Sequence, residues 1–126
     1  MNTIELLAEI QKAAFEVRQH LHFGYVESVY QNALLIELRM RGFRAEKEVF
    51  IPVYYKGYMV GNFRADIFVE NCVVIETKAV RDICPEHEVQ LVNYLTATGV
   101  DDGVLVNYGE SYRFRRKTRI YDPDSF

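Results

Sequence analysis

The sequence predicts an α/β fold in which a mixed central sheet of about four to five strands is flanked by helices. Helical periodicity of apolar residues occupies the first third of the chain and returns over residues 85–98. Apolar runs with the alternation or continuity of strands fill the segments between and after these helices. Because 126 residues with 49% hydrophobic side chains suffice for one core, residues 1–126 are expected to form a single domain.

Composition excludes several classes of protein. No apolar run is long enough to span a bilayer, and the N-terminal stretch carries acids and no basic segment. We therefore expect no membrane span and no signal peptide, with the cytoplasm as the default location. Cys72 and Cys84 are too few for a disulfide scaffold or a four-cysteine cluster. The formal net charge of -3 gives no global attraction to nucleic acid, so a polyanionic partner would need a local basic patch.

Two helices are expected before the first strand. The first spans about residues 2–21, with Asn2 as its N-cap and Glu5 completing a capping-box pattern. The second spans about residues 25–41 and ends at Gly42, a normal C-terminal glycine. The apolar stripe expected on the first helix consists of Ile4, Leu7, Ala14, Val17 and Leu21.

Glu27 in the second helix can be interpreted in two ways. It precedes Tyr30 by three residues and Leu34 by seven, so it lies on the core-facing stripe and its carboxylate can face the sheet. Alternatively, Gly24 is the N-cap and Glu27 occupies the third helical position, where an acid meets the helix dipole. The two interpretations are compatible.

Three strands are expected after these helices. The first covers residues 48–55, and Pro52 within it indicates an edge position or a bulge. The second and third cover residues 58–69 and 72–80 and are joined by a tight turn at residues 70–71.

A third helix is expected over residues 85–98, with Pro85 in its first turn and Gly99 after its end. A turn at residues 101–103 then leads to a short buried strand over residues 104–108.

The last expected strand, residues 112–121, alternates strictly between two faces. Its basic face could track phosphates. Lys and Arg also protect an edge strand against pairing with another chain, and we favour this second interpretation. The basic face consists of Arg113, Arg115, Lys117 and Arg119, and the other face includes Tyr112, Phe114 and Ile120.

The hairpin of residues 62–80 carries ionisable groups where a buried strand should carry none. Asp66 lies in its first strand, and Glu76 and Lys78 lie in its second, among Val, Ile and Phe residues. Buried charges are costly unless they are paired or bind a metal. Mg²⁺ or Mn²⁺ would relieve two adjacent carboxylates, and Lys78 would then point at a water or a phosphate. The alternative is an exposed hairpin with a weak Glu76–Lys78 surface pair.

The register of this hairpin decides whether such a site can exist. A regular two-residue loop would direct the side chains of Asp66 and Glu76 to opposite faces of the sheet. We therefore predict one extra residue, either as a three-residue loop over residues 70–72 or as a β-bulge. Asp66, Glu76 and Lys78 would then share one face, and Glu27 would reach them from the second helix.

The chain resembles the PD-(D/E)XK nuclease-like superfamily, whose core has the order α-β-β-β-α-β. The stretch Gly24-x-x-Glu27-x-x-Tyr30 closely matches the signature of the GxxExxY proteins, a small bacterial and archaeal family placed in that superfamily. Further pieces follow in the expected order over nearly the whole chain. They are Tyr54-Tyr55-Lys56-Gly57, Arg64-Ala65-Asp66, Glu76-Thr77-Lys78 and Gln90-Leu91-Val92-Asn93-Tyr94.

The resemblance implies a restriction-endonuclease-like core and a role for each matched residue. The last piece matches the Q-x-x-x-Y element of the RecB-like nucleases, which lies close to the active site and the substrate. Ala65 stands where the family pattern has a proline, which leaves the acidic residues intact. The implied catalytic residues are Lys78, Glu27, Gln90 and Tyr94, and the implied metal ligands are Asp66, Glu76 and Glu27.

The implied function is that of a metal-dependent nuclease with Mg²⁺ or Mn²⁺ as its cofactor and nucleic acid, preferentially DNA, as its substrate. One alternative is a catalytically weak module with a nucleic-acid-binding or regulatory role, since a fold does not dictate a function. Another is a subunit that needs a partner, either a second copy of itself or a different protein.

Overall fold

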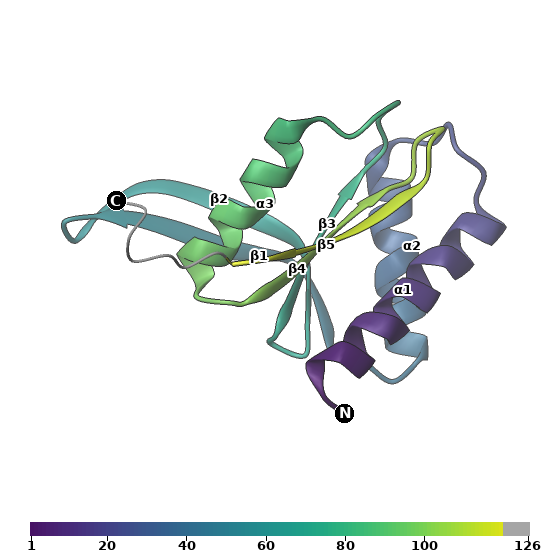
Figure 1. Cartoon of the computed structure of the whole chain (residues 1–126), viewed down its shortest axis with the longest axis horizontal. Helices are drawn as coiled ribbons and strands as arrows, with labels where there is room; N and C mark the ends of the chain where they lie inside the picture. Colours follow the sequence, from purple (N-terminus) through teal and green to yellow (C-terminus); the bar gives the residue numbers. More distant parts are fainter. Residues whose placement is uncertain (120–126) are drawn as a thin grey trace.

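A five-stranded mixed sheet separates two helices on one face from a single helix on the other (Figure 1). The computed structural model describes residues 1–119. The strand order is β1-β2-β3-β4-β5; β3 and β4 pair in parallel, and the other neighbours are antiparallel. The elements are α1 (Thr3–His20), α2 (Glu27–Met40), β1 (Ala45–Tyr55), β2 (Tyr58–Val69), β3 (Val73–Lys78), α3 (Pro85–Thr98), β4 (Asp102–Asn107) and β5 (Arg113–Thr118).

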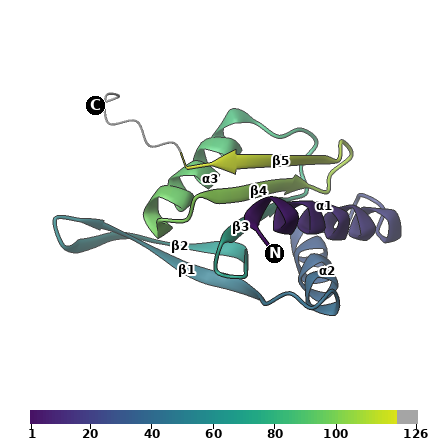
Figure 2. The same ribbon diagram turned by 60° about the horizontal axis from the view of Figure 1, so that its bottom comes forward.

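The expected order of helices and strands is confirmed, and a core lies on each face of the sheet. The larger core lies under α1 and α2, and the smaller one lies under α3 (Figure 2). No helix within residues 1–119 has both the length and the apolar character needed to cross a membrane. The sheet contributes Ile67, Val69, Val73, Ile75, Val104 and Val106 to the larger core, and Ile51, Ala65, Val74 and Leu105 to the smaller one.

Helix α1 begins as predicted, because the Asn2 side chain accepts a hydrogen bond of 2.8 Å from the Glu5 amide. The predicted stripe is wrong at Ile4, which is 61% exposed. Ile4 falls in the first turn of α1, before the first buried residue of the helix, Leu6. The buried residues of α1 are Leu6, Leu7, Ile10, Ala13, Ala14 and Val17.

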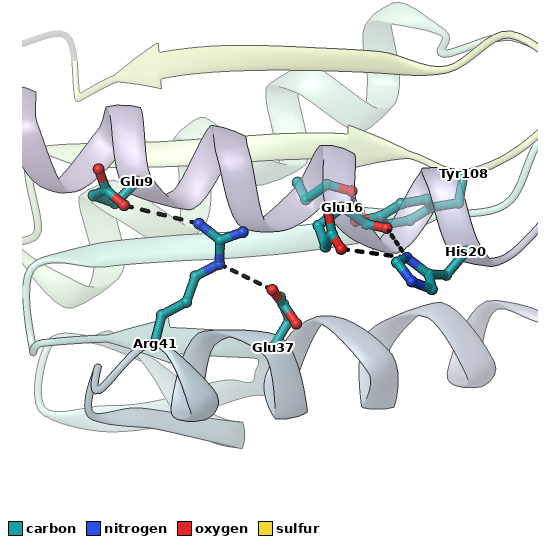
Figure 3. Close-up of polar contacts among 7 residues, drawn as sticks. Glu9, Glu16, His20, Glu37, Arg41 and Tyr108 are labelled. Atoms are coloured by element: carbon teal, nitrogen blue, oxygen red, sulfur yellow. Dashed lines mark hydrogen bonds and ion pairs between the residues drawn. The ribbon is translucent and has the colours of Figure 1, made fainter.

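Polar contacts link the outer faces of α1 and α2 (Figure 3). Arg41, the C-cap residue of α2, lies 3.0 Å from Glu37 of that helix and 3.9 Å from Glu9 of α1. Such partly exposed surface pairs contribute about 0–1 kcal/mol, so the apolar contacts beneath them hold the helices together.

The start of α2 differs from the prediction. Val26, not Gly24, is the N-cap, and Glu27 is the first helical residue rather than the third. Gly24 lies in the preceding loop with a φ of 122°, a conformation that favours glycine. The Tyr30 side chain determines this path: its hydroxyl donates to the His22 carbonyl at 2.6 Å and accepts from a loop amide at 3.1 Å.

The strand bounds differ from the prediction at several ends. β1 begins at Ala45 and lies at the sheet edge, as Pro52 indicated. The predicted turn at residues 101–103 is wrong, because β4 already begins at Asp102 and pairs with both β3 and β5. β3 ends at Lys78, two residues before the predicted end of that strand. The predicted last strand extends into residues 120–121, which lie outside the described residues.

The carboxyl ends of β3 and β4 are joined by the buried Asn107 side chain. Its Oδ1 accepts from the amides of Val80 and Gly109 at 3.0 and 3.1 Å. Its Nδ2 donates to the carbonyls of Val80 and Ser111, both at 2.9 Å. A Cβ at Gly109 would overlap the Val80 carbonyl group, so the two loops approach closely only because residue 109 is glycine. This contact fixes the end of β3 that carries Lys78.

We predict that Gly109→Ala lowers the free energy of unfolding by about 3 kcal/mol or more, because backbone must move to admit the methyl group. Gly57→Ala is the matched control: nothing lies within 4 Å of its Cβ, and only its φ of 84° is unfavourable. The control should lose about 1 kcal/mol. Urea unfolding measures both; equal losses in the two variants would contradict the proposed close approach.

Candidate active site

The β2–β3 hairpin contains the extra residue predicted from the sequence. Val69 pairs with Val73, so residues 70–72 form a three-residue loop. The first two loop residues have φ values of 52° and 54°, and the third donates its amide to the Val69 carbonyl at 3.0 Å. Continued by one further pair beyond Ile67–Ile75, this register places Asp66 opposite Glu76.

Asp66 and Glu76 lie where β2 and β3 separate. The two strands pair only over residues 67–69 and 73–75, and β2 then continues with β1 while β3 continues with β4. Figure 1 shows the β1–β2 ribbon and the end of β3 running in different directions. The Asp66 amide donates to Oε1 of Glu76 at 3.2 Å. The two acids therefore flank the opening between the strands.

Thr77, which the sequence analysis did not select, holds the Asp66 carboxylate in place. Its amide and its hydroxyl donate to Oδ2 of Asp66 at 2.8 and 3.1 Å. Within residues 1–119, no protein N–H donates to Oδ1 of Asp66 or to Oε2 of Glu76. The one available signal in the sequence was a hydroxyl residue between Glu76 and Lys78 in a strand that is otherwise buried.

The environment of Glu76 disfavours its negative charge. Glu76 is 5% exposed, and burial together with the nearby Asp66 carboxylate raises the pKa of Glu76 to about 9. The Asp66 amide and the Lys78 ammonium offset only part of this shift. At neutral pH, Glu76 therefore keeps a proton unless a cation replaces it.

Two adjacent carboxylates with free oxygens and too little positive charge around them fit a divalent cation. Hard cations such as Mg²⁺ and Mn²⁺ prefer carboxylate oxygens, and they bind in competition with the proton on such a group. The donor set of Asp66 and Glu76 therefore suits the type of metal that the sequence analysis anticipated.

Glu27 approaches this pair from the first turn of α2. Burial first, and then the Asp66 carboxylate, raise the pKa of Glu27, and the Lys78 ammonium acts in the opposite direction. One turn later, Gln31 donates its Nε2 to the Asp66 carbonyl at 3.0 Å and so ties α2 to β2. No three acidic, His or Cys side chains within residues 1–119 cluster closely enough to hold one metal ion. Glu27 thus lies beside the Asp66–Glu76 pair without completing a triad.

Tyr94 and Gln90 approach the pair from α3 on the other side. Burial first, followed by the Glu76 and Asp66 carboxylates, raises the pKa of Tyr94. The Gln90 side chain partly offsets this effect. The Tyr94 side chain therefore lies in the electric field of both carboxylates.

The basic face of β5 makes ion pairs within the protein. Arg115 and Lys117 both contact Glu88 of α3, at 3.2 and 3.0 Å, and Arg119 contacts Asp101 at 2.9 Å. β5 forms an edge of the sheet, as predicted, and Phe114 packs on the larger core. Much of the charge on the basic face of β5 is consequently balanced by nearby carboxylates.

The protein thus has an α/β fold with two paired acids where two strands separate, and a lysine follows the second acid by two residues. The chain matches the PD-(D/E)XK nuclease superfamily over residues 4–120. It therefore belongs to the PD-(D/E)XK nuclease superfamily, a membership that indicates a nuclease. The comparison with curated proteins found no match.

Two solved structures share the fold. The crystal structure of SSO0001 has a TM-score of 0.51 at 22% identity, covering 97% of this chain and 80% of that chain. The alkaline exonuclease LHK-Exo from Laribacter hongkongensis also has a TM-score of 0.51, at 14% identity, covering 85% of this chain and 76% of that chain. These likenesses confirm the restriction-endonuclease-like architecture.

We predict that Glu76→Gln stabilises the metal-free protein at pH 8. Between the ordinary pKa of 4.5 and the folded value of about 9, the folded chain binds more protons at Glu76 than the unfolded chain does. Stability therefore falls as the pH rises through this window, and an amide removes the effect. The expected gain is about 1–3 kcal/mol at pH 8, shrinking toward pH 5.

Urea unfolding in a chelator at pH 5 and pH 8 measures this difference. The exposed Glu110 offers a control, since Glu110→Gln should leave stability unchanged at both pH values. A Glu76→Gln protein that is no more stable than wild type at pH 8 would show that the buried carboxylate costs nothing.

Proposed function

We propose that this chain is a metal-dependent nuclease that hydrolyses phosphodiester bonds in DNA. The observation that carries the proposal is the pair Asp66 and Glu76, held side by side with free oxygens where β2 and β3 separate. Structural ion pairs place opposite charges together, whereas this site brings like charges together in a buried position. Such an arrangement is costly for stability and is typical of a catalytic metal site.

Asp66 and Glu76 would hold Mg²⁺ or Mn²⁺, which supplies charge to stabilise a phosphorane and lowers the pKa of water. Thr77 keeps the Asp66 carboxylate oriented, as its two hydrogen bonds to Oδ2 indicate. Lys78, on β3 beyond Glu76, neutralises negative charge that develops on the phosphate.

Glu27 has a raised pKa and an adjacent ammonium group, so it can hold a proton near the scissile bond and orient the attacking water. Gln90 and Tyr94 contact the substrate from α3. Together with Lys78, these three residues form the proposed catalytic set.

We further propose that the chain belongs to the GxxExxY branch of the superfamily. Gly24 adopts the positive φ of the loop, and Tyr30 fastens that loop through two hydrogen bonds, so that α2 begins at Glu27. Each residue of the signature thus contributes to placing the Glu27 carboxylate beside Asp66 and Lys78. We also propose that residues 1–126 act as one domain.

We predict that wild type binds Mn²⁺ and that Asp66→Ala and Glu76→Ala each remove most of this binding. Affinity should rise between pH 6 and pH 8, because the cation displaces a proton from Glu76. Calorimetric titration measures both effects, with Glu110→Ala as the control. Unchanged affinity in both site variants would exclude this pair as the metal site.

We predict that Lys78→Ala lowers the cleavage rate by about 100-fold or more while metal affinity and the unfolding midpoint are retained, because the ammonium acts on the transition state. Labelled single- and double-stranded DNA and RNA, incubated with Mg²⁺, Mn²⁺ or a chelator, provide the assay. The exposed Lys12 supplies the control Lys12→Ala. Cleavage by Lys78→Ala at the wild-type rate would remove this lysine from the mechanism.

A further inference from the structure

The distal part of the β1–β2 ribbon, residues 49–65, extends past α3 away from the rest of the sheet (Figure 1). It contains no carboxylate in a chain whose net charge is -3. Its cations are Lys56 and Arg64, and the Arg64 guanidinium lies 4.8 Å from the centre of the Phe50 ring. The ribbon also carries the aromatic residues Phe50, Tyr54, Tyr55, Tyr58 and Phe63.

An open slot of about 410 Å³ lies between this ribbon and α3. Phe63 of the ribbon faces Tyr94 of α3, and their ring centres are 5.7 Å apart. The volume suits a small organic group such as a nucleobase. The slot is lined by Val53 and Phe63 from the ribbon and by Pro85, Glu86, Val89, Gln90, Asn93 and Tyr94 from α3 and its start.

The lining favours a flat, neutral occupant over a phosphate. None of the lining residues is a lysine or an arginine, and Glu86 would repel an anion. Phe63, although apolar, is 45% exposed, so its ring is free to stack on a ligand. The side chains of Gln90 and Asn93 each offer donors and an acceptor, which match the polar edge of a base.

The slot adjoins the candidate active site. Tyr94 lines the slot and also lies in the field of the Glu76 and Asp66 carboxylates. A nucleic-acid strand whose phosphate lies at these carboxylates would therefore bring a neighbouring base to the ring of Phe63.

We propose that this slot holds the base next to the scissile phosphate, stacked on Phe63, and that the substrate is therefore single-stranded at that position. The inference rests on the proposed nuclease function and adds the strand state of its substrate. A base in an intact duplex is stacked between its neighbours and would first have to leave the helix, which costs stacking and pairing energy. A single strand presents its bases without this cost.

Binding of fluorescein-labelled oligonucleotides in chelator, where no metal-dependent cleavage occurs, tests the proposal. Wild type should bind single-stranded DNA about tenfold more tightly than duplex of the same length. It should also prefer the base-bearing strand over an abasic strand. Phe63→Ala should weaken binding of the base-bearing strand about tenfold and abolish its preference over the abasic strand.

Phe50→Ala is the matched control, since Phe50 lies on the same ribbon and is 57% exposed but does not line the slot. It should leave the preference for bases intact. Phe63→Leu keeps an apolar side chain and guards against loss of folding; it should lose the preference as Phe63→Ala does. The proposed role of the slot would be overturned if both Phe63 variants bind as wild type does. It would also be overturned if wild type binds duplex and single strand equally.

The two proposals can fail separately. If wild type cleaves nucleic acid but Phe63 has no effect on binding, the nuclease function holds and the slot is excluded. If Phe63 governs binding of single strands but no substrate is cleaved with any metal, the slot holds and the nuclease function is excluded.

Discussion

The structure of the site depends on the three-residue loop between β2 and β3. One residue fewer would turn Glu76 away from Asp66, and every later side chain of β3 would change faces with it. In this register two non-glycine residues of the loop adopt positive φ, which is an unfavourable backbone conformation. The resulting carboxylate pair is unfavourable for the metal-free fold, because burial and the Asp66 charge raise the pKa of Glu76. Local strain and buried like charge in one hairpin indicate a site shaped for binding rather than for stability.

The polar groups around this pair have the opposite character, since their hydrogen-bonding capacity is well used. Asn107 makes four hydrogen bonds that join the loops after β3 and β4, and Thr77 satisfies one oxygen of Asp66. Tyr30 is fully buried, bonds the loop before α2, and stacks on Tyr108 with ring centres 5.0 Å apart. These contacts make the surrounding framework stiff, so that it can hold two carboxylates that repel each other.

The sequence was sufficient for the element order and for the extra hairpin residue, because the requirement that two acids share an ion excludes the simpler loop. It failed where a distant side chain decides the local structure. Glycine is a residue type that is accepted at N-caps, but the hydrogen bonds of the Tyr30 hydroxyl hold Gly24 in the preceding loop, so that α2 starts later. Residues 101–103 resemble a turn, yet β4 starts there because Asp102 pairs with Val73 of β3 and Thr118 of β5, both distant in sequence.

The ion pairs of β5 show why charge in a sequence differs from charge on a surface. Arg115 and Lys117 lie on one face of β5, as cations of a phosphate-binding strand would, but both converge on Glu88 of α3. Recruiting them to a phosphate would first require breaking contacts that the folded protein already makes. The ribbon of residues 49–65 contains no carboxylate itself, and of its two cations Arg64 lies 4.0 Å from the neighbouring Glu48. Its aromatic side chains offer an attraction that does not depend on charge. In a chain of net negative charge, stacking on exposed rings is therefore a more effective way to hold a polyanion than a basic strand whose charge is neutralised by Glu88 of α3.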